Sequence, residues 1–174
     1  MTTQTDIPLY ERPDIYARRW FLLGIMCLSL VMVVMSVSGL NVAIPTMQES
    51  LDASATDLQW IVDSYAIVFA GLLLTAGAIG DRFGRKRALQ YGLVVFALGS
   101  LVGTFADTVE VVILARAVMG VGAAFIMPAT LSIISAVFPP EERTKAIAVW
   151  AGFAGAGGAL GPLAVGFLLT DWWI

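Results

Sequence analysis

Histidine is absent from this chain of 174 residues, and cysteine occurs once, at Cys27. Without histidine the chain lacks the commonest metal ligand and the commonest acid–base group near neutral pH, and one cysteine cannot form an internal disulfide. The sequence also lacks a Cys-x-x-Cys pair, a Gly-x-x-x-x-Gly-Lys-Ser/Thr phosphate loop and a Gly-x-Ser-x-Gly nucleophile elbow. These absences argue against the common enzyme classes, and we expect neither a cofactor nor a bound metal.

Charge is scarce as well. Charged residues make up 13% of the chain, against roughly 25% in an average soluble domain. Hydrophobic residues make up 59%, and the mean hydropathy of +0.85 does not suit a surface that faces water. The net charge of −3 argues against a nucleic-acid partner, because such a partner requires a basic stripe. The composition therefore predicts a membrane protein whose partner is the lipid bilayer.

Five apolar segments are long enough to cross a bilayer core, which requires about 20 residues. They lie at about 20–45, 59–80, 88–105, 111–136 and 146–169. None of them alternates polar and apolar residues with period two, and unbroken apolar runs in lipid favour helices over strands. We predict an all-α membrane protein with a polar tail at 1–19 and a transmembrane region at 20–174 that contains five helices.

The charges between these segments sort by side. Basic residues lie before the first segment, after the second and after the fourth, at Arg12, Arg18, Arg19, Arg82, Arg85, Lys86, Arg87, Arg143 and Lys145. The opposite loops hold acids and no lysine or arginine, with Glu49, Asp52, Asp57, Asp107, Glu110 and Asp171. Because basic loops favour the cytoplasmic face, we predict a cytoplasmic N-terminus.

The densest charge lies between the second and third predicted helices. The chain there reads GAIGDRFGRKRAL from Gly77 to Leu89, with one acid and four bases within Asp81–Arg87. A turn with this charge is too costly for hydrocarbon, so it marks one membrane face. Its lettering resembles the loop signature of the major facilitator superfamily, which it matches at Gly77, Asp81, Gly84, Arg85 and Lys86.

In that superfamily the loop ties the cytoplasmic ends of two transporter halves together and loosens as the transporter switches. The resemblance therefore implies a conformational latch, with Glu141 or Glu142 as the partner of Arg85, formed by the residues Gly77, Asp81, Arg82, Gly84, Arg85 and Lys86. The alternative is an ordinary basic loop, which explains the arginines but not the Gly-x-x-x-Asp-x-x-Gly-Arg spacing.

The fourth predicted helix contains an intramembrane arginine. The run from Leu114 to Ala124, LARAVMGVGAA, is similar to the family's fourth-helix motif, with Arg116 at its arginine and Met119 where glutamine is usual. An arginine about seven residues into a span is costly unless it is paired or hydrated, which favours a functional role. The alternative is an arginine at the outer edge that extends its side chain to water.

The fifth predicted helix is rich in small residues. Its Gly157-x-x-x-Gly161-Pro162 spacing resembles the antiporter motif, which in the family accompanies exporters, and Gly166 keeps the second glycine of a later pair. Small residues let a neighbouring backbone approach closely, and an internal proline favours a bend. We predict a closely packed, bent helix that helps to seal the membrane, with simple small-residue packing as the alternative.

The first two helices resemble the fourteen-helix drug/proton antiporter branch. The runs that carry this resemblance are QWIVDSY from Gln59 to Tyr65 and LNVAIP from Leu40 to Pro45. That branch commonly has an aspartate five residues before the asparagine, where this chain has Ser36. If proton coupling requires a carboxylate in this half, Asp63 must supply it.

Asp63, Arg116 and Asn41 lie at similar depth. A helical rise of about 1.5 Å per residue places Asp63 roughly 6–7 Å, Arg116 roughly 7–10 Å and Asn41 about 6 Å below the outer ends of their helices. Pairing or shared water between Asp63 and Arg116 is expected, since either charge alone in hydrocarbon is costly. We predict a polar centre for proton coupling and substrate binding that comprises Asp63, Arg116, Asn41 and Ser36. The alternative is a static ion pair that joins the two helices.

Together these features predict five helices of an N-terminal six-helix half, and we expect the missing C-terminal half to complete the cavity. The predicted protein is a proton-coupled exporter of small amphipathic or cationic compounds in the bacterial inner membrane. Its expected partners are protons and a small-molecule substrate. The alternatives are an exporter of a dedicated metabolite and a non-transporting membrane sensor or scaffold. A complete five-helix protein is the alternative to a fragment.

Overall fold

The computed structural model describes residues 8–171, and for 169–171 it describes the backbone alone. This part of the chain contains a short 3₁₀ turn and five α-helices, and no strand. The elements are η1 (Leu9–Glu11), α1 (Pro13–Ser50), α2 (Ala55–Phe83), α3 (Arg85–Thr104), α4 (Val109–Val137) and α5 (Pro140–Asp171). All five α-helices are long and apolar enough to cross a membrane, which confirms the predicted fold class.

The helices extend beyond the predicted spans. All five begin earlier than predicted, and all except α3 also end later. For example, α1 begins at Pro13, where a proline is favourable in the first turn, so the end of the predicted 1–19 tail is helical. Helix α2 begins with a capping box, in which Ser54 and Asp57 bond each other's backbone N–H groups. Residues 1–7 of the predicted tail and 172–174 of the predicted transmembrane region lie outside the described residues.

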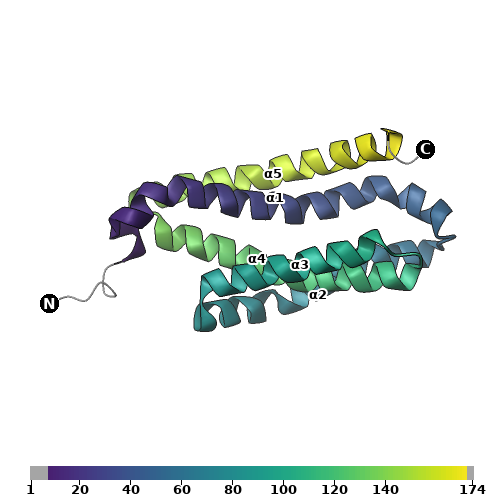
Figure 1. The fold of residues 1–174 in the computed structure, drawn as a ribbon, viewed down its shortest axis with the longest axis horizontal. Helices are drawn as coiled ribbons and strands as arrows, with labels where there is room; N and C mark the ends of the chain where they lie inside the picture. The colour runs from purple at the N-terminus through teal and green to yellow at the C-terminus, as the bar shows by residue number, and fades with distance from the viewer. Residues whose placement is uncertain (1–7, 172–174) are drawn as a thin grey trace.

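The helices form two groups that α4 joins. Helices α1 and α5 lie side by side, and both α2 and α3 pack against α4 (Figure 1). Helix α4 also contacts α1. The α3–α4 contact depends on glycine: a Cβ atom on Gly122 would lie 2.7 Å from the carbonyl oxygen of Gly92. Small residues here allow the two backbones to approach closely, as is common between membrane helices.

The connections divide the bundle into two chemically different ends. The basic end contains the start of α1, the α2–α3 turn and the α4–α5 connection, with the basic residues named above. The acidic end contains the α1–α2 connection at 51–54 and the α3–α4 connection at 105–108. The structure thus places the two sets of loops at opposite ends of the helices, whereas the assignment of the basic end to the cytoplasm stays a prediction.

Candidate functional site

A pocket of about 640 Å³ lies between α1, α2 and α4. Its walls are mostly aliphatic and aromatic, and its polar side chains are Ser38, Asn41, Tyr65 and Arg116. We call this space the central pocket. Its volume is in the range of about 300–1,000 Å³ that small-molecule sites occupy, and apolar walls with few polar groups are typical of such sites.

Arg116 is the ionised side chain among the residues that line this pocket, and it is only 6% exposed. Its Nε donates to the carbonyl oxygen of Ile61 at 3.3 Å, and its Nη1 donates to the carbonyl oxygen of Ser36 at 3.4 Å. The guanidinium carbon lies 4.4 Å from the centre of the Tyr65 ring, a cation–π distance. The arginine therefore lies inside the bundle, between α1 and α2, and does not extend to a bundle edge.

The predicted polar centre is only partly assembled. Asn41 and Arg116 line the same pocket, but Asp63 is not among the residues that line it. The Asp63 carboxylate accepts a hydrogen bond of 3.3 Å from the Gln59 amide, and the expected direct pair with Arg116 is not formed. The reason is rotation about the α2 axis. Residues 62, 65, 66 and 69 face the pocket, whereas 59 and 63 belong to the adjacent stripe of the helix.

Ser36 contributes to the site through its backbone. Its carbonyl oxygen accepts from Arg116, whereas its hydroxyl donates to the carbonyl oxygen of Val33 at 2.8 Å. A carbonyl oxygen has two lone pairs, so it can accept from a side chain in addition to a helical N–H. Sequence reasoning identified Ser36 as a replaced aspartate, and it missed this direct contact with Arg116.

The predicted latch loop lies at the basic end and is tied to α4. Gly84 joins α2 to α3 with a φ of +107°, a conformation that favours glycine because it has no Cβ atom. Arg85 donates to the Asp81 carboxylate at 3.2 Å, and its Nη1 donates to the carbonyl oxygen of Ser132 in α4 at 2.9 Å. The loop residues 81–87 are exposed, so this ion pair is open to water.

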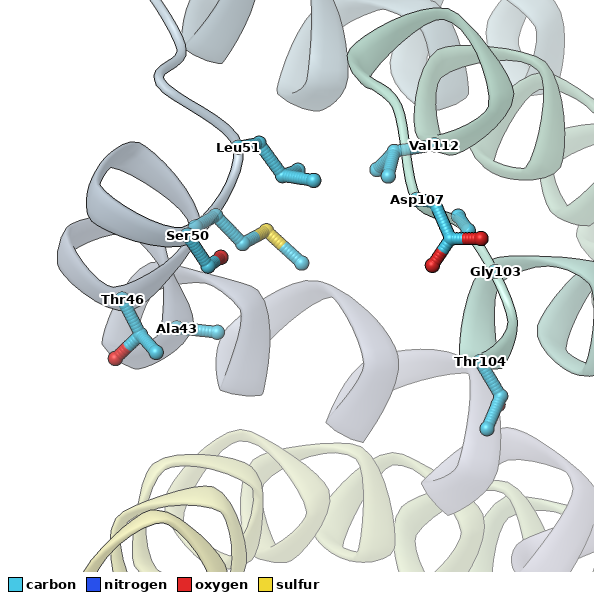
Figure 2. A pocket seen from close by; sticks show the side chains of 10 residues that line it. Ala43, Thr46, Ser50, Leu51, Gly103, Thr104, Asp107 and Val112 are labelled. Carbon is cyan, nitrogen blue, oxygen red and sulfur yellow. The ribbon is translucent and has the colours of Figure 1, made fainter. Parts of the chain in front are cut away.

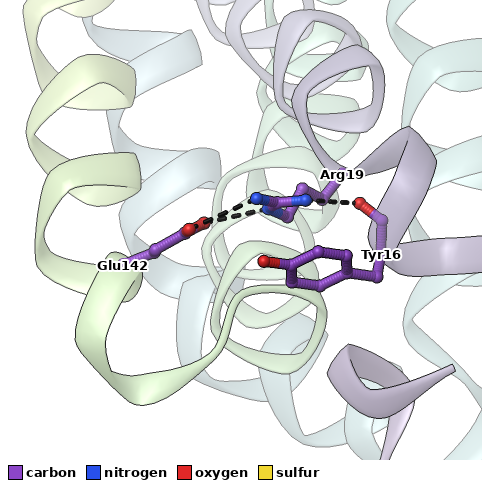
Figure 3. Close-up of polar contacts among 3 residues, drawn as sticks. All are labelled: Tyr16, Arg19 and Glu142. Carbon is purple, nitrogen blue, oxygen red and sulfur yellow. Dashed lines mark hydrogen bonds and ion pairs between the residues drawn. The ribbon is translucent and has the colours of Figure 1, made fainter. Parts of the chain in front are cut away.

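The predicted partner of Arg85 pairs elsewhere. Figure 3 shows Glu142 at the start of α5 facing Arg19 of α1, with N–O distances of 2.9 and 3.2 Å. Arg19 also donates to the carbonyl oxygen of Tyr16 at 2.7 Å, and its guanidinium lies 3.6 Å from the centre of the Tyr16 ring. The sequence predicts Glu141 or Glu142 as the partner of Arg85. Glu142 instead pairs with Arg19, because α1 and α5 pack along each other, and the carboxylate that accepts from Arg85 is that of Asp81.

The Arg19–Glu142 pair lies among polar residues before the apolar part of α5. The hydrogen bond from Arg19 lowers the pKa of the Glu142 carboxyl, and the positive charge of Lys145 adds to this effect. The carboxylate therefore stays ionised near neutral pH. Sequence reasoning placed both residues at the same end of the bundle, but that placement alone does not say which basic side chain reaches the carboxylate.

The motif in α5 packs against α1. A Cβ atom on Gly157 would lie 3.2 Å from the Val31 Cα, and one on Gly161 would overlap the Ser38 hydroxyl. The Ser38 hydroxyl lies 3.3 Å from the Gly157 carbonyl oxygen, a hydrogen-bond contact between the helices. Gly166 differs, because a Cβ atom there would meet no atom within 4 Å. Pro162 lies inside α5 and is half-buried. Two of the three motif glycines thus permit close packing.

A second pocket, of about 520 Å³, lies at the acidic end. Figure 2 shows Leu51 and Asp107 on opposite walls, with Thr46 and Ser50 on the α1 side and Thr104 on the α3 side. Sequence reasoning counted Asp107 among the acidic loop residues and did not predict a pocket there. No local sequence pattern indicates this pocket, because the walls of the pocket come from three separate segments of the chain.

Comparison with known proteins identifies relatives of the whole bundle. The family model described as "Major Facilitator Superfamily" matches residues 26–174. The methyl viologen resistance protein SmvA of Salmonella typhimurium is 42% identical over 90% of this chain and 32% of that protein. The multidrug efflux pump LfrA of Mycolicibacterium smegmatis is 41% identical over 87% of this chain and 30% of that protein.

Another relative and a solved structure agree with these matches. The puromycin resistance protein pur8 of Streptomyces alboniger is 40% identical over 93% of this chain and 32% of that protein. A crystal structure of a bacterial homologue of the human lysosomal transporter Spinster, inward-facing and unoccupied, matches with a TM-score of 0.79 at 21% identity. That match covers 86% of this chain and 32% of the other, and it shows the fold alone. This chain thus spans about a third of its curated relatives' length.

Proposed function

The chain belongs to the Major Facilitator Superfamily, and from that premise we propose that it is the N-terminal part of a proton-coupled exporter. The exported compounds are small and amphipathic or cationic, and the membrane is the bacterial inner membrane. The names of the relatives support efflux, because they refer to resistance to methyl viologen and puromycin and to multidrug efflux. A transporter of this family moves its substrate without converting it chemically, so the proposal includes no enzymatic activity.

The central pocket is the observation that carries this proposal. It combines apolar walls with a buried cation and the polar side chains of Asn41 and Tyr65. Such a lining fits a compound that has both an apolar body and a polar group. In our proposal the C-terminal half of the transporter supplies the opposite wall, because the substrate sites of this class lie between two repeats.

We assign proton coupling to Asp63. The side chain is half-buried in α2, and its carboxylate is bonded to Gln59 rather than to a basic residue. A carboxylate without an ion-pair partner can take up and release a proton without first breaking a salt bridge. Coupling to Arg116 then requires water between the two groups or a rotation of α2, since the two do not pair directly in this conformation.

The basic end is the cytoplasmic end in this proposal, and its α2–α3 loop is the conformational latch. The Asp81–Arg85 pair and the Arg85–Ser132 contact hold the loop against α4. Both contacts are exposed and short-ranged, so a partner from the C-terminal half can compete for Arg85 when the transporter switches. Close packing of Gly157 and Gly161 on α1 keeps the α1–α5 contact rigid and sealed.

A dye-efflux assay tests the proposal. The complete protein encoded by the gene is produced in bacteria that lack their own exporters, and the cells are loaded with ethidium. We expect dye to leave energised cells against its gradient and to stop leaving when a protonophore is added. Equal dye loss in cells with and without the protein would rule out export. Export that persists after addition of the protonophore would rule out proton coupling.

A further inference from the structure

The central pocket has an unbalanced charge. Arg116 contributes a full positive charge to the lining, and none of the residues that line the pocket is acidic. The described contacts of its guanidinium are two backbone carbonyl oxygens and the Tyr65 ring. These groups are dipoles or a quadrupole, so they solvate the cation without neutralising it. A buried charge without a counter-ion favours an anionic partner strongly, because the interior screens charge poorly.

The pocket also contains donors that are not in use. The structure gives Arg116 Nη2 no hydrogen-bond partner among the described residues, and the same holds for the Tyr65 hydroxyl and the Asn41 amide. An arginine guanidinium only donates, and both tyrosine hydroxyl and asparagine amide can donate. The free Nη2 of the buried cation and two further unused donors in the lining of the same pocket provide a site for a group that accepts several hydrogen bonds. A carboxylate is such a group.

An aromatic wall adjoins these donors. The rings of Tyr65 and Phe69 are stacked, with centroids 6.1 Å apart and an interplanar angle of 10°. Both rings line the central pocket, together with the aliphatic side chains of Val34, Val62 and Met127. Tyr65 is buried beneath Arg116, whereas Phe69 is half-buried. A flat aromatic body can therefore lie against the Phe69 ring, because offset ring contacts are favourable. The site therefore has a polar region and an apolar region side by side on α2.

We propose that the central pocket binds amphipathic aromatic carboxylates, with the carboxylate at Arg116, Asn41 and the Tyr65 hydroxyl and the ring against Phe69. This inference rests on the proposed export function and narrows its substrate class. The guanidinium of Arg116 disfavours aromatic cations in this half of the pocket. A cation that the complete protein exports, such as ethidium, therefore needs a carboxylate from the C-terminal half.

The experiment measures equilibrium binding to the complete protein in lipid nanodiscs. The probes are 2-naphthoate, the isosteric neutral 2-naphthamide and the cationic 2-naphthylmethylammonium. We expect 2-naphthoate to bind at least about tenfold more tightly than the amide, the difference that a hydrogen bond to a charged group provides. The ammonium compound is expected to bind most weakly. Equal affinity for the three probes, or tightest binding of the ammonium compound, would overturn the proposal.

Three variants test whether the preference for 2-naphthoate depends on the charge of the central pocket. Arg116→Gln is expected to bind 2-naphthoate and the amide equally, whereas Arg18→Gln, a change at an exposed arginine on α1, is expected to keep the wild-type preference. Val37→Glu adds a carboxylate at a pocket position that is 40% exposed, and it is expected to shift the preference to the ammonium compound. If Arg116→Gln does not fold, Val37→Glu decides: an unchanged preference for naphthoate would contradict the proposal.

The two proposals fail in different ways. Binding is measured without a gradient, so a tenfold preference for naphthoate stands even if the ethidium assay shows no proton-driven export. Conversely, protonophore-sensitive export of ethidium together with equal binding of the three naphthyl probes would retain the export function and reject the carboxylate site.

Discussion

Two arginines of this chain lie against tyrosine rings, one at the basic end and one in the central pocket. Arg19 lies 3.6 Å from the centre of the Tyr16 ring and pairs with the Glu142 carboxylate. Arg116 lies 4.4 Å from the centre of the Tyr65 ring and contacts backbone carbonyls instead of a carboxylate. The aromatic contact is similar, but among residues 8–168, whose side chains are described, only Arg19 of these two arginines has a counter-ion.

This difference suggests a structural role for Arg19 and a ligand-binding role for Arg116. Arg19 and Glu142 form two hydrogen bonds and join α1 to α5, so their charges are already balanced. Arg116 is more deeply buried, which makes its missing counter-ion more consequential. We infer from the comparison that an arginine in a membrane bundle is a candidate for ligand binding when burial and an unbalanced charge occur together.

Replacing each arginine in turn tests whether Arg116 serves ligand binding and Arg19 serves stability. In the complete protein we expect Arg116→Gln to abolish export, because the pocket loses the cation that this half supplies, and Arg19→Gln to lower thermal stability while export continues. Efflux rates and thermal unfolding in detergent measure the two effects. If both variants lost export while remaining folded, the distinction between the two arginines would be invalid.

The packing of α5 on α1 extends from the Arg19–Glu142 pair at the basic end to Ser38 in the central pocket. Loss of this packing is expected to have the next largest effect on export. Gly161→Leu is expected to separate α5 from α1, because even a Cβ atom there overlaps the Ser38 hydroxyl. Gly158→Leu is the matched control, since a Cβ atom at Gly158 meets no atom within 4 Å. We expect export to be lost in the first variant and kept in the second. Normal export by Gly161→Leu would show that close packing is unnecessary.

The fold could be predicted from the sequence because apolar length decides which segments cross a membrane. The helical rise predicts a common depth for Asn41, Asp63 and Arg116, and two of these residues, Asn41 and Arg116, line one pocket. The rotation of α2 could not be predicted, because tertiary packing against α4 decides which stripe faces the pocket. Asp63 therefore bonds to Gln59 instead of Arg116.

The ion pairs at the basic end also depend on helix packing that could not be predicted from the sequence. The positive loops indicated which residues share that end, whereas the pairing depends on which helices are neighbours. Because α5 packs along α1, Glu142 reaches Arg19, and Arg85 bonds to Asp81 and to α4. The charge pattern of the loops predicts the membrane side of each residue, but it does not predict which helices are neighbours within the membrane.

A change in the latch loop is expected to have a smaller effect on export, because it alters the conformational switch and leaves the pocket intact. We expect Asp81→Asn to reduce the export rate while membrane insertion and expression stay normal, because Arg85 loses its carboxylate partner but keeps the Ser132 contact. Transport assays alongside quantification of the inserted protein measure this effect. Labelling of a cysteine introduced at Lys86→Cys from the cytoplasmic side tests the topology, and labelling only from the opposite side would reverse it.

The smallest expected effect concerns pH and the Arg19–Glu142 pair. Because folding lowers the pKa of Glu142, the pair's contribution to stability is present near neutral pH and is lost as the pH falls through that lowered pKa. Wild type is therefore expected to exceed Glu142→Gln in Tm near neutral pH, with the difference vanishing in acid. A Tm difference that is independent of pH would show that the charge of Glu142 is unimportant.

Uphill transport by Asp63→Asn tests the central claim most directly. The complete protein is reconstituted in proteoliposomes, a pH gradient is imposed, and accumulation of substrate against its own gradient is measured for wild type and variant. We expect wild type to accumulate substrate, whereas Asp63→Asn is expected to bind substrate and to equilibrate it across the membrane without accumulating it. Full uphill accumulation by Asp63→Asn would contradict the assignment of Asp63 as the essential proton carrier.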